Sequence, residues 1–239
     1  MTRVLVFQHL AAEGPGRFEA MLAADGVSVT TVRFWLADEI PALEDFDQLW
    51  VMGGDMDVWD VDIHPWLVAE KRAIRRWIGA LARPYLGICL GHQLAADALG
   101  GTCGPQRPAE IGIGRIELTP QGQRDPLFAG LPPRFEALQW HGVRVAQPPD
   151  GASVLAGSHD CRCQALAFGP RAYGLQFHVE AQAPAVREWG CVSDYRAMLD
   201  RELGAGGFDR LEADFARSEG AFQEMAQRLY RNFMTLAAA

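Results

Sequence analysis

Two spacings of hydrophobic residues alternate along the first hundred positions, and they predict strands and helices in turn. Short apolar or β-branched runs are typical of buried strands, whereas apolar residues three and four positions apart are typical of helices. The predicted strands are 3–7, 27–32, 48–52 and 85–88, and the predicted helices are 14–24, 65–82 and 92–99. This alternation favours a mostly parallel sheet with helices on both faces.

Beyond Gly101 the pattern changes to short strands separated by glycine, proline and aspartate. The predicted strands are 113–118, 134–138, 153–156, 163–168 and 172–178. We expect them to extend the same sheet and to add an antiparallel flap. From Pro184 onward the helical spacing returns, interrupted by a turn at 204–207. The apolar stripe of this last part consists of Phe222, Met225, Leu229, Phe233 and Leu236.

Together these elements predict an α/β protein with a three-layer αβα fold of the flavodoxin-like or Rossmann-like type. Its central sheet is expected to be mainly parallel. Residues 1–182 form the α/β domain in this prediction, and residues 183–239 form a C-terminal helical extension. Because the apolar stripe of the extension must be buried, we expect the extension to pack on the domain.

Composition excludes several classes of protein. The chain has 239 residues, 49% of them hydrophobic, which is enough for a large core. Its 22 basic residues are outnumbered by 30 acidic ones, and the net charge of −8 argues against a nucleic-acid binder. The longest uncharged segment, 84–96, is shorter than the roughly 20 residues that cross a bilayer, so no membrane insertion is expected.

Cysteine and lysine usage narrows the picture further. Five cysteines without a secretion signal favour reduced thiols and a cytoplasmic location. Cys161 and Cys163 lack the second ligand pair of a zinc site, so we interpret them as half-buried thiols beside a strand. The only lysine, Lys71, does not belong to a Gly-Lys-Ser/Thr phosphate-binding loop. Neither a metal nor a cofactor is expected.

The segment Gly87-Ile88-Cys89-Leu90-Gly91 joins a predicted strand to a predicted helix. A nucleophile on such a turn needs small neighbours, because the backbone is sharply bent and strained. The helix N-terminus would favour a thiolate, and the N–H of Leu90 would face a developing oxyanion. On this pattern alone, Cys89 is explained equally well as a buried cysteine in a tight strand–helix junction.

A second polar pair lies near the end of the last predicted strand. His178 and Glu180 are two positions apart, so their side chains project from the same face of a strand. A carboxylate so placed can fix the tautomer of an imidazole and stabilise its protonated form. Alone, the pair is an ordinary feature of a strand end. Together with Cys89 it predicts a nucleophile, a general base and an orienting acid at the carboxyl edge of the sheet.

A third feature is the pair Gly53 and Gly54 directly after the predicted strand 48–52. Two glycines let the backbone approach a ligand closely, and their N–H groups suit an anion. By themselves they are better explained as an ordinary β-turn.

These segments together resemble the class-I glutamine amidotransferase family. The motifs Gly-Ile-Cys-Leu-Gly-His-Gln at 87–93, Phe-His-Val-Glu at 177–180 and Met-Gly-Gly-x-Met at 52–56 match in order and spacing. Gln139-Trp140-His141-Gly142 is similar to the family's glutamine-binding loop. The resemblance covers residues 1–182. The helical tail is similar to an extension of stand-alone members related to the glutaminase part of GMP synthase.

The resemblance implies hydrolysis of L-glutamine through a cysteinyl thioester. Cys89 would attack the side-chain amide, His178 would pass the thiol proton to the leaving ammonia, and Glu180 would hold His178. The N–H groups of Gly54 and Leu90 would form the oxyanion hole. The residues that would hold the substrate are Gly53, Gln93, His141, Gly142 and Val143. In the family the ammonia usually passes to a separate synthase domain or subunit.

Three residues depart from the family pattern. Val179 replaces a proline between the histidine and the glutamate, and we expect the triad to tolerate this loss of a backbone stiffener. Asp55 replaces a proline or small residue, and we expect its carboxylate to point away from the oxyanion site. Val143 stands where an acidic residue is frequent, which bears on substrate contacts or on coupling to a partner.

The remaining histidines receive non-catalytic interpretations. His92 is expected to be structural or to face a partner. His9, His64 and His159 are expected to be ordinary surface residues. His141 lies in the expected substrate loop without an assignable acid–base role.

Two other functions stay open. A γ-glutamyl peptide hydrolase would use the same triad and differ only in the pocket for the leaving group. A non-catalytic regulatory partner would keep the fold alone.

Overall fold

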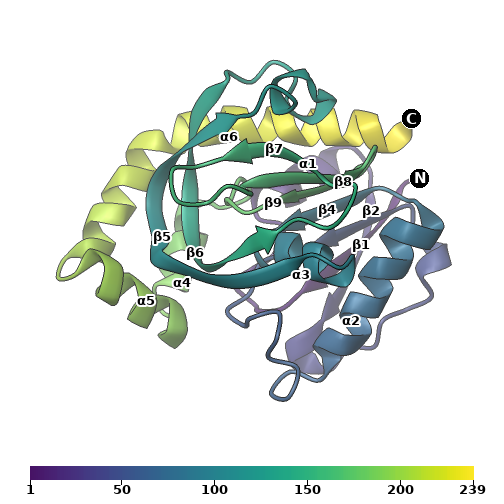
Figure 1. Ribbon diagram of the computed structural model, residues 1–239, viewed down its shortest axis with the longest axis horizontal. Coiled ribbons are helices and arrows are strands. Elements are labelled where there is room, and N and C mark those ends of the chain that lie inside the picture. The colour runs from purple at the N-terminus through teal and green to yellow at the C-terminus, as the bar shows by residue number, and fades with distance from the viewer.

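The computed structural model describes residues 1–239 as one nine-stranded sheet with helices packed against it (Figure 1). The strands are β1 (Arg3–Gln8), β2 (Ser28–Arg33), β3 (Gln48–Val51), β4 (Tyr85–Ile88), β5 (Thr102–Leu118), β6 (Arg134–Gln147), β7 (Ser153–Gly157), β8 (Ala165–Gly169) and β9 (Ala172–Leu175). The α-helices are α1 (Arg17–Ala24), α2 (Trp66–Arg75), α3 (Leu90–Ala98), α4 (Ala183–Trp189), α5 (Ser193–Leu203) and α6 (Gly207–Ala238).

The sheet has a parallel and an antiparallel part, in the order β2-β1-β3-β4-β9-β8-β7-β5-β6. Strands β2, β1, β3, β4 and β9 pair in parallel, and the remaining neighbours pair antiparallel. This arrangement confirms the predicted α/β fold with a mainly parallel centre and an antiparallel extension. Parallel strands end at one common edge, so residues that follow β1, β3, β4 and β9 can meet there.

The antiparallel part differs from the prediction in the length of two strands. Strands β5 and β6 contain 17 and 14 residues and form a long curved hairpin (Figure 1). Residues 139–142, which we expected to form a loop, therefore lie inside β6, where His141 pairs with Glu110. The cause is the pairing itself, because a partner strand can hold a glycine-containing segment extended where its own propensity would not.

Alternate residues of the central strands face two different layers of helices. Val4 and Val6 of β1 join the core cluster that contains residues of α1 and α6, whereas Leu5 and Phe7 join the cluster with residues of α2 and α3. This period of two, with both faces covered, explains the continuous apolar runs in the sequence.

Helix α6 belongs to the same core as the sheet. Its predicted stripe is buried at Phe222, Met225, Leu229 and Phe233. The Phe233 ring meets the Trp50 ring of β3 at 5.8 Å between centroids. The extension thus packs on the sheet, as the stripe predicted. Neither α6 nor any other helix is both long and apolar enough to cross a membrane.

One buried arginine joins α1 and α6 to the backbone beyond β9. The Nε of Arg17 donates to the Ala181 carbonyl at 2.9 Å, and its Nη1 donates to Gln223 at 2.7 Å. Its Nη2 lies 3.2 Å from Glu219. A charge this deeply buried is tolerated because carboxylate and carbonyl oxygens surround it.

Several smaller predictions are settled by the structure. The helix predicted for 65–82 is α2 followed by one π-helical stretch, Arg76–Leu81. The turn at 204–207 is present, with Gly204 and Gly206 at φ values of 64° and 70°. Cys161 and Cys163 are fully rather than half buried, because the core between α3, β6 and β8 encloses them.

Candidate active site

Cys89 lies on the turn that joins β4 to α3, in a backbone conformation that side chains rarely adopt. Its φ is 51°, in the left-handed region. The turn is possible because its neighbours have no Cβ: one on Gly91 would lie 2.1 Å from the Val51 carbonyl oxygen. One on Gly87 would lie 2.6 Å from the Gly91 backbone. Such strain persists where the surroundings fix it, often at functional sites.

His178 and Glu180 meet next to this turn. The Nδ1 of His178 lies 2.7 Å from Oε1 of Glu180, and both side chains are buried. Strand β9 ends at Leu175, before the predicted end at 178. His178 is held by an isolated bridge instead, in which its N–H donates to the Leu138 carbonyl at 2.9 Å. The two side chains share a face because the backbone stays extended beyond the regular strand.

The electrostatics of the thiol and the imidazole are linked. Burial raises the pKa of the Cys89 thiol, and the interaction and hydrogen bond with His178 oppose this effect. Burial lowers the pKa of His178, but Glu180 and Cys89 outweigh it and hold that pKa well above its usual value. The amide of Gln176 also reaches the Cys89 sulfur at 3.6 Å. A thiolate here is thus stabilised by its neighbours against the cost of burial.

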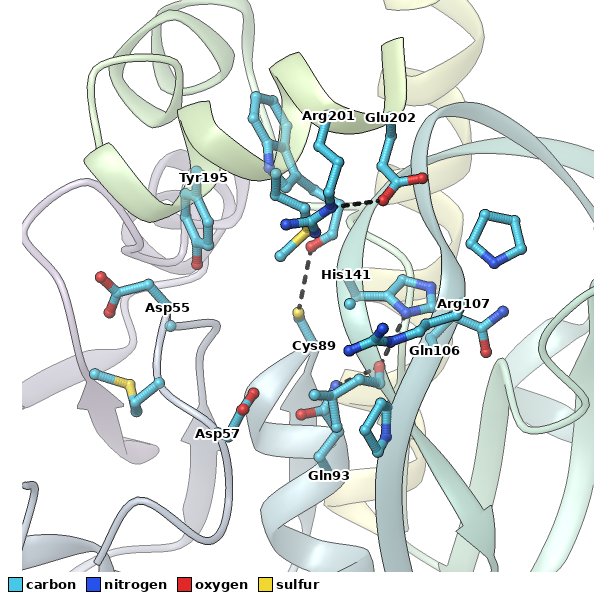
Figure 2. Close-up of a pocket in the computed structure, with 18 of the residues that line it drawn as sticks. Asp55, Asp57, Cys89, Gln93, Gln106, Arg107, His141, Tyr195, Arg201 and Glu202 are labelled. Carbon is cyan, nitrogen blue, oxygen red and sulfur yellow. Dashed lines mark hydrogen bonds and ion pairs between the residues drawn. The ribbon is translucent and has the colours of Figure 1, made fainter. Parts of the chain in front are cut away.

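A cavity of about 480 Å³ opens over Cys89 (Figure 2). Its walls come from the loop after β3, from the β5–β6 hairpin and from α5. Helix α5 contributes Tyr195, Met198, Arg201 and Glu202, so part of the wall belongs to the C-terminal extension. The single thiol faces a cavity whose other lining groups are mostly polar or charged, which suits a small polar substrate.

The structure places the predicted substrate residues at this cavity with one exception. Gln93, His141, Gly142 and Val143 line it, whereas Gly53 is buried behind its wall. The Gln93 amide donates to the Val143 carbonyl at 3.0 Å, and a His141 nitrogen lies 3.0 Å from the same oxygen. These two side chains are therefore engaged within the wall and shape it.

Asp55 also lines the cavity, at its outer part. Figure 2 shows its carboxylate pointing away from the Cys89 sulfur, as we expected from the electrostatic cost of the opposite orientation. Burial raises the pKa of this carboxyl group.

Two backbone N–H groups near the thiol have no acceptor within the protein. Leu90 is the first residue of α3, so its N–H lies ahead of the helical hydrogen-bond pattern. The N–H of Gly54 likewise donates to no protein atom. The two residues are in contact, since a Cβ on Gly54 would lie 2.8 Å from Cδ2 of Leu90. Two free donors beside a nucleophile can stabilise a developing negative charge.

The expectation for His9 is wrong: the side chain is buried. Its Nδ1 lies 2.8 Å from the Gly53 carbonyl oxygen, and its Nε2 lies 2.9 Å from Oε1 of Glu70. Glu70 is 61 residues away in the sequence, so no local pattern marks the pair. One signal was present, because Glu70 shares the buried face of α2 with Leu67 and Ile74.

The other histidines agree with their non-catalytic interpretations. His92 is fully buried, and burial lowers its pKa to about 3, which leaves a neutral structural ring. His64 is half-buried, and His159 is exposed.

Glu13 is a further buried acid that sequence reasoning missed. It accepts a hydrogen bond from the hydroxyl of Tyr195 on α5, and its second oxygen has no partner. Burial raises the pKa of Glu13, while His178 and Tyr195 oppose this effect. The contact joins the segment after β1 to the wall formed by α5.

Comparison with known proteins agrees with this geometry. Residues 18–185 match the family described as glutamine amidotransferase class-I. The glutamine amidotransferase-like protein YfeJ of Salmonella typhimurium is 31% identical over 77% of this chain and 78% of its own. A glutamine-hydrolysing subunit of GMP synthase from Ignicoccus hospitalis is 40% identical over 48% of this chain, and the match spans 58% of that subunit.

Solved structures extend the likeness to the whole chain. A glutamine amidotransferase from Thermotoga maritima is 26% identical, with a TM-score of 0.85 over 97% of both chains. One from Methylobacillus flagellatus is 29% identical, with a TM-score of 0.84 over 99% of this chain and 95% of its own. With a matched family region that covers most of the sheet and includes the cysteine turn, this chain belongs to the class-I glutamine amidotransferases.

Proposed function

We propose that this protein hydrolyses the side-chain amide of L-glutamine to glutamate and ammonia through a thioester on Cys89. One observation carries the proposal. A strained, buried cysteine at a cavity interacts with a buried histidine whose Nδ1 is 2.7 Å from a carboxylate. That combination provides a nucleophile, a base and an orienting acid.

The chemistry follows from the three side chains. His178 accepts the thiol proton as Cys89 attacks the amide carbon, and it delivers that proton to the nitrogen as the carbon–nitrogen bond breaks. Water then attacks the thioester, its proton passes through His178, and the thiol is restored. Glu180 keeps Nδ1 of His178 protonated so that the other nitrogen can act as the base. The N–H groups of Gly54 and Leu90 stabilise the oxyanion in both steps.

Substrate contacts are proposed from the cavity wall. The backbone of Gly142 and Val143 would hold the glutamyl part, and Gln93 and His141 would fix that backbone through their bonds to Val143. Gly53 would act from behind the wall through its peptide bond to Gly54. As an activity that releases ammonia, the reaction would serve a separate synthase subunit in the cytoplasm, in line with the GMP synthase subunits that the chain resembles.

A second candidate is hydrolysis of γ-glutamyl peptides. The cavity volume of about 480 Å³ falls in the range of pockets that enclose drug-sized ligands, so a leaving group larger than ammonia has room. The same thioester chemistry would apply. A purely regulatory role is less well supported, because all three side chains of the triad are in place.

The experiment is to measure glutamate and ammonia release by the purified chain, with Cys89→Ala as the control. We expect hydrolysis of glutamine by the wild type and a loss of at least about a thousandfold in the variant. A panel of γ-glutamyl dipeptides runs in parallel. Cleavage of the dipeptides alone would replace the first function by the second, and equal activity of Cys89→Ala would contradict both.

A further inference from the structure

The mechanism above leaves a second buried glutamate–histidine pair unused. His9 follows β1, and Glu70 lies on α2; both side chains are fully inaccessible to solvent. The His9 ring stacks on Phe34 and Trp66, with centroids 5.7 Å and 5.6 Å away. Two ionisable groups without solvent are costly unless their hydrogen bonds are made, so this pair calls for an explanation.

The two bonds of His9 fix which nitrogen carries a proton. A carbonyl oxygen can only accept, so Nδ1 must donate to the Gly53 oxygen at 2.8 Å. Nε2 then shares a second proton with the Glu70 carboxylate at 2.9 Å. Burial lowers the pKa of His9, but Glu70 and the Gly53 carbonyl outweigh it and raise that pKa. Glu70 thus keeps Nδ1 in the donating form.

The bond to Gly53 also determines where the next N–H points. In a trans peptide the carbonyl and the following N–H point in opposite directions. His9 holds the carbonyl of the Gly53–Gly54 peptide, so the N–H of Gly54 faces away from His9. Between two glycines such a peptide would otherwise rotate at little cost. Glu13 closes the space behind it, since a Cβ on Gly53 would lie 1.8 Å from Oε2 of Glu13.

We propose that His9 is a positioning residue for the oxyanion hole. It holds the Gly53–Gly54 peptide so that the N–H of Gly54 is directed at the oxyanion formed by attack of Cys89, and Glu70 supports it. This inference rests on the proposed function, because it concerns the same tetrahedral intermediate. His9 itself touches neither the substrate nor the thiol in this role.

The test compares His9→Leu, which removes the donor, with His9→Asn, whose amide can reach the position of Nδ1. We expect His9→Leu to lower kcat for glutamine by about 10²–10³, the usual effect of losing one oxyanion donor, with little change in KM. His9→Asn should stay within about tenfold of the wild type. Phe34→Leu is the matched control, because it removes a stacking ring without touching the Gly53 carbonyl.

A second readout separates positioning from a general loss of structure. Alkylation of Cys89 by iodoacetamide displaces iodide and forms no oxyanion, so its rate should stay unchanged in His9→Leu. A parallel fall in alkylation and hydrolysis, or an unchanged kcat, would overturn the proposal. If His9→Leu does not fold, His9→Gln replaces it. Its longer amide reaches the position of Nε2, so it must retain less kcat than His9→Asn.

Failure of the proposed function would look different. A wild-type chain that hydrolyses no glutamine and no γ-glutamyl peptide contradicts the function itself. An active wild type with an equally active His9→Leu contradicts only the role of His9.

Discussion

Two buried glutamate–histidine pairs in this protein have nearly the same geometry and different neighbours. His178–Glu180 and His9–Glu70 are joined at 2.7 Å and 2.9 Å, and each histidine follows the carboxyl end of a parallel strand. His178 interacts with the Cys89 thiol, whereas Nδ1 of His9 meets the Gly53 carbonyl. A thiol can give up a proton and a carbonyl cannot. The third group therefore decides that one pair is suited to proton transfer and the other to holding a peptide.

The largest expected difference between the pairs comes from replacing each acid by its amide. Glu180→Gln can donate to Nδ1 and force the proton onto the nitrogen that should act as the base, so kcat should fall by about 10²–10⁴. Glu70→Gln can donate to Nε2 of His9 and leave Nδ1 donating, so kcat should stay within about tenfold. Steady-state kinetics of glutamate formation measures both, and equal losses would mean that the pairs do not differ in role.

The titration of Cys89 should separate the pairs more finely. His178 lowers the pKa of the thiol, so His178→Asn should move the midpoint of iodoacetamide alkylation to higher pH. The rate at pH 7 would fall about tenfold for every unit by which the pKa rises. His9→Asn should leave the midpoint in place. A shift of similar size in both variants would show that His9 also acts on the thiol.

The smallest effects should come from Glu13, the acid that lies near both pairs. Its charge raises the pKa of Cys89, so Glu13→Gln should move the alkylation midpoint to lower pH. Burial raises the pKa of Glu13 itself. Its contribution to stability is therefore greatest below the pKa of the unfolded chain and is lost as the pH rises.

The same variant should consequently be more stable than the wild type at pH 8, by a Tm difference on the order of 2–4 °C, and less so at pH 5. Thermal unfolding at the two pH values measures this. A gain that is larger at pH 5 would contradict the sign of the pKa change.

The two pairs also show how far sequence can predict a site. The glycines around Cys89 and the two-residue spacing of His178 and Glu180 are local, so both were recognisable from the sequence. His9 and Glu70 meet only because β1 and α2 pack together, and a residue between a strand and a loop carries no mark of that contact. The parallel strands were likewise visible as apolar runs.

The long hairpin was harder to predict for a related reason. Residues 102–112 and 139–142 contain glycine, proline and polar residues that suggest loops. Their extended form depends on pairing between β5 and β6. Pairing partners, unlike apolar runs, cannot be identified from one segment of sequence.

The Arg17 contacts have a consequence for anyone who wishes to redesign the cavity. One guanidinium binds the Ala181 carbonyl directly after Glu180 and, on α6, Gln223 and Glu219. Tails from other relatives are therefore not freely interchangeable. A grafted α6 without oxygens at these two positions would leave a buried cation uncompensated next to the catalytic acid. Libraries that aim at new substrates should vary the inner face of α5 and keep α6 as it is.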